Sequence, residues 1–394
     1  MANYLPNQYK IDNALGINHN YLREQFEDHK EIFAEIEELL SDSQFTLGSY
    51  VDECEVLFAN RVGAKYAIGV GSGTDAIFLS LKALGVGPGD EVITTPFTYI
   101  ATIGAIATTG AKPVFVDIKE DFNIDEKLIE AKITTKTKCI VPVHWTGRPC
   151  EMNEIHKIAE KFNLKIVQDA CHAIDSKYNN NDLVNYGGIA CYSMHPLKNL
   201  NVWGDGGFVT TNDAHFAEKI SLMRNHGLID RDNAEFFAYN SRLDSIQAIV
   251  AKYLIRNRLD NITKSRQENA LYFDELLNDV PEITLNQRNK NLSEVFHLYQ
   301  FKAKNRDELK MHLIQKGVDA KIHYPKPMHL QKAAKYLGYS EGDFPVAENL
   351  AQISMSLPVH EFITKSQIEY AVDNIKLFYR DWIASSIRWL KKKI

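Results

Sequence analysis

The sequence contains few cysteines, and their arrangement excludes two kinds of site. Only five of the 394 residues are cysteine, namely Cys54, Cys139, Cys150, Cys171 and Cys191. Their number is odd, and no pair has the Cys-x-x-Cys spacing of zinc sites and redox motifs. We therefore expect neither a disulfide framework nor a zinc site or other metal site, and the cysteines indicate a reducing compartment.

The sequence also lacks a long apolar run and a strong excess of one charge. No stretch of about 18 apolar residues is present, so no membrane span is expected. The first 20 residues are polar and lack the apolar centre of a signal peptide, so we expect a cytoplasmic protein. The formal net charge is only −6, which predicts no broad basic surface and no nucleic-acid partner.

What is present is an alternation of short apolar segments and helical segments between residues 66 and 209. Alternation of this kind predicts an α/β fold with a mostly parallel central sheet and helices on both faces. The expected helices are residues 74–84, 100–109 and 153–163. The expected strands are residues 66–70, 91–95, 113–117, 139–143, 165–169 and 208–211.

The segments on either side of this region predict a second, smaller domain. Apolar spacing indicates helices at residues 21–41 and 51–62, and a long helix or a helix pair at 240–276. Beyond residue 294 we expect a strand at 297–303 and an amphipathic helix at 307–317. We therefore divide the chain into a large domain of residues 1–255 and a smaller C-terminal α+β domain of residues 256–394.

Four segments follow strands of the predicted sheet and are expected to meet in one cleft. They are Gly71-Ser72-Gly73, Pro96-Phe97-Thr98-Tyr99, His144-Trp145 and Asp169. In open α/β sheets, ligands bind beyond the carboxyl ends of the strands. The first segment joins a strand to a helix, where backbone N–H groups and the helix dipole form an anion site. The alternative is an ordinary turn in which Ser72 or Thr74 caps the helix.

Asp169 and Lys198 together indicate a type of reaction. Pyridoxal phosphate (PLP) chemistry needs a lysine that holds the aldehyde as a Schiff base. It also needs a carboxylate against the pyridine nitrogen, so that the protonated ring draws electrons from the substrate carbanion. Each residue alone has an ordinary alternative, Asp169 as a helix N-cap and Lys198 as a surface lysine. Behind the glycine loop, the pair suggests an aminotransferase.

Motifs along nearly the whole chain, from about residue 39 to 379, resemble those of the DegT/DnrJ/EryC1/StrS sugar aminotransferases. The most characteristic are Asp169-Ala170-Cys171-His172-Ala173 and Ser193-Met194-His195-Pro196-Leu197-Lys198-Asn199. The resemblance implies a fold-type I PLP enzyme with a smaller C-terminal domain. The other matching stretches are residues 71–76, 87–93, 96–102, 113–117, 204–207, 239–244, 323–325, 342–348 and 357–360.

The resemblance also implies roles for individual residues. Lys198 resembles the Schiff-base lysine that moves the proton between donor and cofactor, and Asp169 the partner of the pyridine nitrogen. The implied cofactor contacts are a stacking Tyr99, phosphate-binding Ser72, Gly73, Thr74 and Ser193, and His172 near the ring hydroxyl. Asn240 resembles an asparagine that the partner subunit donates to the phosphate, which implies a homodimer with shared sites.

The expected reaction converts a keto-sugar, nucleotide-linked in our interpretation, to an amino-sugar with glutamate as donor. The motif around Lys198 mixes features of enzymes that aminate C3 and C4, so the sugar carbon stays open. Alternatives are a transaminase of a non-nucleotide cyclic keto-polyol or sugar and a PLP-binding regulatory protein. The candidate substrate residues are His195, His323 and Tyr324, and the candidate diphosphate contacts are Arg224, Arg231, Arg242 and Lys326.

Overall fold

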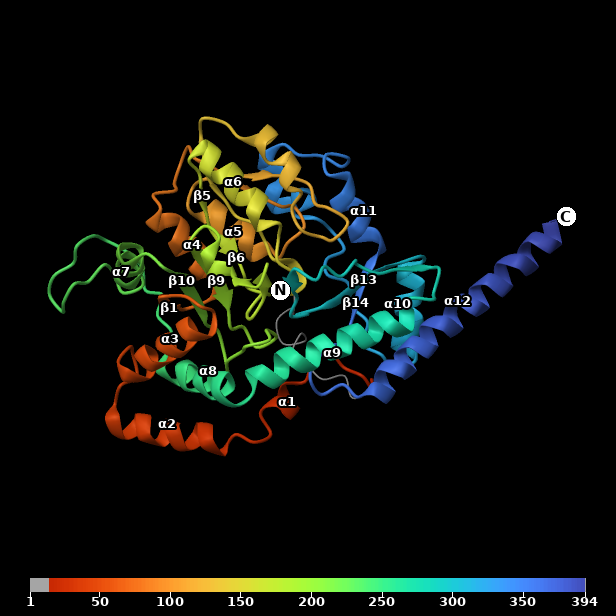
Figure 1. Ribbon diagram of the computed structural model, residues 1–394, viewed down its shortest axis with the longest axis horizontal. Helices are drawn as coiled ribbons and strands as arrows, with labels where there is room; N and C mark the ends of the chain where they lie inside the picture. The colour runs from red at the N-terminus through yellow and green to blue at the C-terminus, as the bar shows by residue number, and fades with distance from the viewer. Residues whose placement is uncertain (1–13, 394) are drawn as a thin grey trace.

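The computed structural model describes residues 14–393, and side chains as far as residue 382. Its central sheet consists of two four-stranded parts, β3-β2-β4-β5 and β6-β9-β10-β1, which continue into each other (Figure 1). The link is the extended segment that contains both β5 (Lys165–Ile166) and β6 (Gln168–Asp169). There Val167 N donates to Ile140 O at 3.0 Å, and Asp169 pairs with Val143 in a parallel bridge.

The predicted mostly parallel sheet is confirmed, with one antiparallel strand. β10 (Gly207–Thr211) runs antiparallel to both of its neighbours, β1 (Tyr66–Val70) and β9 (Ile189–Ser193), whereas β9 and β6 are parallel. The pairs β2–β3, β2–β4 and β4–β5 are also parallel. The remaining strands of this part are β2 (Glu91–Thr94), β3 (Lys112–Phe115) and β4 (Thr137–Ile140).

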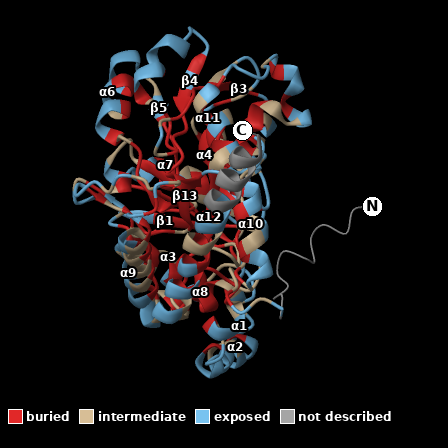
Figure 2. Cartoon of the chain, turned by 90° about the vertical axis from the view of Figure 1, so that its right-hand side faces the viewer, coloured by how far each residue is buried: buried red, intermediate tan, exposed pale blue. Residues whose placement is uncertain are grey.

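Helices cover both faces of the sheet, as predicted. Successive strand residues point to opposite faces, so Ile93 and Ile166 join one apolar cluster while Val92 and Val167 join another. The first cluster includes residues of α3 (Ser49–Arg61), α6 (Met152–Phe162) and α8 (Ser245–Asn257). The second includes residues of α4 (Gly73–Ala83), α5 (Ile100–Thr108) and α7 (Ala214–Met223). Figure 2 shows the buried strands between helices whose outer faces are exposed.

One predicted helix is interrupted, whereas a predicted helix pair is confirmed. The helix predicted at 21–41 forms α1 (Leu22–Gln25) and α2 (Lys30–Asp42), because Phe26 packs edge-on against Trp203 and Gln25 is bound by Asn201. The segment predicted at 240–276 is a helix pair that begins only at Ser245. α8 and α9 (Leu259–Leu277) are separated at Arg258, which has non-helical backbone angles.

The C-terminal part contains a smaller antiparallel sheet of order β11-β13-β14. Its strands are β11 (Ile283–Thr284), β13 (Tyr299–Ala303) and β14 (Ser354–Leu357), with α10 (Arg306–Gln315), α11 (Pro345–Ile353) and α12 (Lys365–Lys393). The end of α12 extends away from the rest of the chain (Figure 1). A further small sheet has β7 (Lys177–Tyr178), β8 (Asn181–Asp182) and β12 (Leu292–Ser293). The division at residue 255 stays a prediction.

Within the described residues, none of the helices has the length and apolar character needed to cross a membrane. Short 3₁₀ helices complete the structure at Glu126–Leu128, Glu130–Lys132, Trp145–Gly147, Leu183–Asn185, Met328–Leu330 and Lys332–Leu337.

Candidate active site

Asp169 lies at the carboxyl end of β6 with its carboxylate held from two sides. The residue is only 5% exposed. Thr102 Oγ1 donates to Asp169 Oδ2 at 2.7 Å, and Cys171 N donates to Oδ1 at 3.1 Å. Thr98 lies one helical turn before Thr102 and bonds to its hydroxyl at 2.8 Å. No helix follows Asp169 directly, so the alternative of a helix N-cap is wrong.

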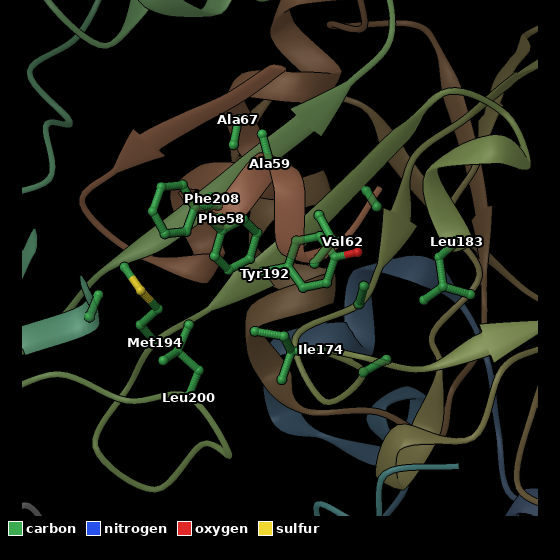
Figure 3. Packing of buried hydrophobic residues seen from close by; sticks show 14 of the residues in the cluster. Phe58, Ala59, Val62, Ala67, Ile174, Leu183, Tyr192, Met194, Leu200 and Phe208 are labelled. Atoms are coloured by element: carbon green, nitrogen blue, oxygen red, sulfur yellow. The ribbon is translucent and has the colours of Figure 1, made fainter. Parts of the chain in front are cut away.

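Lys198 lies in the loop between β9 and β10, in a turn closed by a 2.8 Å bond from Lys198 N to His195 O. Met194 and Leu200 fix the loop, because both are almost fully buried in the cluster around Phe58 and Tyr192 (Figure 3). Lys198 is itself partly buried and is not a surface lysine. Burial lowers the pKa of its ammonium group, while Cys171 and Asp169 act in the opposite direction. A lowered pKa increases the share of the neutral amine, which is the nucleophilic form of lysine.

The glycine loop packs against Ser193 and Cys171 at the start of α4. A Cβ on Gly73 would lie 2.6 Å from Ser193 Cβ and 2.9 Å from Cys171 Sγ, so no larger residue fits without a shift. Ser72 Oγ accepts from Asp75 N at 3.1 Å, which makes Ser72 the N-cap of α4. Thr74 is exposed on the first turn. The two interpretations of the loop are therefore compatible, since a capped helix N-terminus still attracts an anion.

His172 is in contact with two other rings, those of Trp145 and His297. Its ring centroid is 5.1 Å from that of Trp145 and 4.1 Å from that of His297. Among the side chains that the structure describes, its buried Nδ1 has no hydrogen-bond partner. Burial lowers the pKa of His172 well below its usual value, and the positive charge of Lys198 lowers it further.

Tyr99 and two of the candidate substrate residues, His323 and Tyr324, form a chain of ring contacts. Tyr99 is 47% exposed, and its ring lies 5.8 Å from that of Tyr324. His323 bonds through Nδ1 to Ser356 Oγ at 2.6 Å, and burial lowers its pKa to about 3. His195 is partly buried, and its Nδ1 accepts from Leu197 N at 3.3 Å.

Asn240 lies apart from these residues, at the end of the segment that joins α7 to α8. It is exposed and forms an antiparallel bridge with Asn225. The segment projects from the body of the chain (Figure 1), and Phe237 within it is 103% exposed. The neighbouring Ser241 accepts a bond from Gly71 N at 3.0 Å, so the segment returns to the glycine loop.

One candidate diphosphate contact is wrong. Arg224 is buried, forms an ion pair with Glu55 and donates to Gly69 O at 2.7 Å, so its guanidinium group serves the fold. Arg242 donates to Asn225 Oδ1 at 3.1 Å. Arg231 and Lys326 are exposed and stay candidates.

Three residues near the site were not expected from the sequence, and the first is Gln300, a partner of the expected Trp145. Trp145 Nε1 donates to Gln300 Oε1 at 2.6 Å, and Gln300 Nε2 donates to His323 O at 2.8 Å. The other two are Thr102 and His297. Thr102 lies in the first turn of α5, four residues after Thr98 of an expected cleft segment, and this short spacing is a signal that could have identified it. Gln300 and His297 lie in a strand segment about 130 residues beyond Asp169, and nothing in their local sequence points to this site.

The arrangement defines a class of protein: a fold-type I α/β enzyme with a lysine and a buried carboxylate at the carboxyl edge of the sheet. No group of three potential metal ligands occurs among the side chains that are described. Residues 27–376 match the DegT/DnrJ/EryC1/StrS aminotransferase family, and the chain belongs to this family.

Individual relatives cover most of the chain. A protein of Geobacillus stearothermophilus named pleiotropic regulatory protein is 42% identical, over 91% of this chain and 97% of its own length. The dTDP-3-amino-3,4,6-trideoxy-alpha-D-glucose transaminase of Streptomyces venezuelae is 36% identical, over 89% of this chain and 91% of its own. The crystal structure of S. venezuelae DesV in complex with a ketimine intermediate matches with a TM-score of 0.89 and 35% identity. It covers 92% of this chain and 98% of DesV.

Proposed function

We propose that the chain is a PLP-dependent aminotransferase that converts a nucleotide-linked keto-sugar to an amino-sugar, with glutamate as the amino donor. The observation that carries this proposal is the buried, doubly hydrogen-bonded carboxylate of Asp169 in the same site as Lys198, whose pKa burial lowers. The transaminase of S. venezuelae, and one of Aneurinibacillus thermoaerophilus named for a dTDP-linked amino-sugar, support the nucleotide-sugar class.

The residues of the site fit PLP. Asp169 would face the pyridine nitrogen, and Lys198 would bind the aldehyde carbon. Gly73 lets the start of α4 pack directly against Ser193, because an added Cβ would lie 2.6 Å from Ser193 Cβ, and the backbone N–H groups of this helix start would bind the phosphate. The unpaired Nδ1 of His172 provides a hydrogen-bonding group for the ring hydroxyl. When bound, the cofactor would supply an electron-withdrawing ring that stabilises a carbanion at the amino-bearing carbon.

The remaining roles are divided between binding and proton transfer. Lys198 Nζ moves the proton between the amino-bearing carbon and the cofactor. Tyr99 would stack on the ring, and Thr74 and Ser72 would support the phosphate. His195, His323 and Tyr324 contact the sugar. Asn240 reaches the phosphate of a partner subunit, which makes the enzyme a homodimer with shared sites, and the exposed segment around Phe237 supports this assembly.

The cytoplasm is the compartment that we propose. All five cysteines are free, and four of them are buried. Free thiols of this kind persist in a reducing compartment.

A Lys198→Ala variant tests the reaction. We expect the purified wild-type protein to be yellow with PLP, and the variant to lose the visible absorbance of the lysine-linked cofactor and all transamination. Lys219→Ala is the control, because Lys219 Nζ only donates to Ala83 O, at 2.7 Å. Full transamination by Lys198→Ala would contradict the proposal.

A second experiment selects among substrates. The protein is loaded with the pyridoxamine form of the cofactor, and a panel of nucleotide keto-sugars and one free inositol-type ketone is added. We expect a nucleotide keto-sugar to restore the visible absorbance. Restoration by the free ketone alone would select the non-nucleotide alternative.

Regulation is the second candidate function, because the relative of 42% identity carries the name of a regulatory protein. A colourless protein that binds no PLP would favour regulation without catalysis. The presence of both Asp169 and Lys198 favours catalysis.

A further inference from the structure

His172 is held between two rings that come from distant parts of the chain. Trp145 follows β4, whereas His297 precedes β13 in the C-terminal part. The planes of His172 and His297 are inclined by 35° with centroids 4.1 Å apart, and Trp145 lies on the ring at 5.1 Å and 50°. Rings in such contact restrict the rotation of the imidazole about its side-chain bonds.

The backbone at His297 and the ring of Trp145 are fixed by hydrogen bonds. His297 N donates to Thr146 O at 2.8 Å, and Val295 N donates to Gly147 O at 3.2 Å. Trp145 is held by its 2.6 Å bond to Gln300 and by the bond from its N to Asn123 Oδ1 at 3.0 Å. The rings therefore form a rigid frame around His172.

Gly147 permits this close packing. Its φ is +92°, and a Cβ at this position would lie 2.6 Å from Val295 Cγ2 and 2.8 Å from His172 O. Only glycine accommodates both the backbone conformation and the approach of the two segments. The contact of His297 with His172 is thus built into the backbone of the loop.

The electrostatic surroundings keep the pair uncharged. Burial lowers the pKa of His297 well below its usual value, and His172 and Lys198 lower it further. The other charged or titratable groups that act on the pair are Arg266 and His323, and both oppose protonation as well. Each ring also has a buried Nδ1 without a hydrogen-bond partner among the described side chains. A neutral imidazole can offer one N–H group and one lone pair, depending on its tautomer.

We propose that His297 is a positioning residue: its ring holds the ring of His172 against Trp145, so that the unpaired nitrogen of His172 faces the ring oxygen of the cofactor. The proposal rests on the proposed function for the identity of that oxygen. It assigns to the C-terminal part of the chain a role in the cofactor site that no sequence motif indicates. His297 acts through His172 and has no contact of its own with the cofactor.

The first experiment needs no cofactor. Histidines of the apoprotein are modified with diethyl pyrocarbonate, and His172 is followed by mass spectrometry in the wild type, His297→Ala and His297→Phe. We expect His297→Ala to increase the modification rate of His172 at least about threefold, because the ring loses one of its two neighbours. His297→Phe retains a ring at this position and should stay close to the wild type. Equal rates in all three proteins would overturn the proposal, as would an equal increase in both variants.

The second experiment uses the PLP-loaded enzyme and follows its visible absorbance against pH. A hydrogen bond from His172 would reduce the negative charge on the ring oxygen. Without this bond the oxygen is more negative, and this raises the pKa of the nitrogen that links Lys198 to the cofactor. We therefore expect His297→Ala to raise the midpoint of the absorbance change by roughly half a pH unit. The control is His312→Ala, which removes a histidine of α10 that packs on Phe378 of α12. This variant should leave the midpoint unchanged.

A double variant separates positioning from a direct role. In a His172→Ala background, His297→Ala should have no further effect on the midpoint, because His297 acts only through His172. The same shift in both backgrounds would overturn the proposal. A wild-type protein that binds no PLP would contradict the proposed function alone, and the modification rates of the apoprotein would still decide the role of His297.

Discussion

The two walls of the Lys198 site are built in different ways. The sheet wall, consisting of residues 72–74, Asp169 and Ser193, comes from the ends of three strands of the central sheet. The C-terminal wall, consisting of His323 and Tyr324, is held by bonds between segments far apart in sequence. Gln300 connects it to Trp145 of the large part of the chain, at 2.6 Å, and to the carbonyl of His323, at 2.8 Å.

This difference indicates that the two walls have different functions. Strand ends meet at one edge of any parallel sheet, so the sheet wall follows from local patterns that form the fold. The C-terminal wall needs correct packing of the smaller sheet on the larger one before it exists. We expect changes in the sheet wall to affect the cofactor and the chemical step, and changes in the C-terminal wall to affect the substrate.

The largest effect is expected from Asp169→Asn in the sheet wall. Asparagine can still accept the bond from Thr102, but it carries no negative charge to keep the ring nitrogen protonated. We expect kcat/KM to fall roughly 10³-fold with little change in the unfolding temperature, measured by steady-state kinetics and thermal unfolding. Asp205→Asn, in the loop after Lys198, is the control. A variant with near wild-type kcat would show that Asp169 is not the partner of the ring.

Gly73→Ala should weaken the phosphate side of the same wall. The new Cβ would lie 2.6 Å from Ser193 Cβ, so the start of α4 must move away from the position that receives the phosphate. We expect the Kd for PLP to rise roughly 10- to 100-fold, measured by titration of the apoprotein. Gly104→Ala is a matched control within α5, because nothing lies within 4 Å of its added Cβ. Equal affinities would show that the phosphate binds elsewhere.

The sequence predicts the elements of the sheet wall better than contacts between segments that are far apart in the chain. The strands, the helices on both faces and the positions of Asp169 and Lys198 follow from apolar periodicity and from motifs in the large part of the chain. The break between α1 and α2 was not predictable from periodicity, because it depends on Trp203 and Asn201, about 175 residues away. Arg224 illustrates the opposite error. Its charge suggested a ligand, whereas its partner Glu55 lies on another helix that no local pattern connects to it.

Gln300→Leu should break the C-terminal wall and leave the sheet wall intact. Gln300 is 4% exposed, and its replacement leaves Trp145 Nε1 and the carbonyl of His323 without their partner. We expect the KM for the keto-sugar to rise about tenfold while the Kd for PLP stays unchanged, because an unpaired buried group costs about 1–3 kcal/mol. Gln331→Leu, on the exposed side of the Met328–Leu330 turn, is the control. A changed PLP affinity with an unchanged KM would contradict the expectation that the C-terminal wall serves the substrate and not the cofactor.

The smallest expected effect comes from pH, which should loosen the C-terminal wall before the central sheet. Burial lowers the pKa of His323 to about 3 and that of His360 to about 4, from an ordinary value of 6.5. Both histidines lie in the C-terminal part. Here the closed form is the folded C-terminal part, and the opened form is the same part locally unfolded. Above pH 6.5 both histidines are mainly neutral in both forms, so neither changes the free energy of opening. As the pH falls from 6.5 toward 4, the opened form takes up protons that the closed form excludes, so the free energy of opening decreases.

Each such histidine contributes at most about 1.4 kcal/mol per pH unit to this decrease. Hydrogen exchange, corrected for intrinsic rates, should therefore show that protection of residues 299–303 and 354–357 falls between pH 6.5 and pH 5. Protection of residues 189–193 and 207–211 should change less, because one histidine with a pKa of about 4, His144, bonds to the central sheet at Gln168, whereas both His323 and His360 act on the smaller sheet. His360→Gln should reduce the pH dependence, since a glutamine can still donate to Asn18 O and takes up no proton. A parallel loss of protection in both sheets would show that the two walls open as one unit.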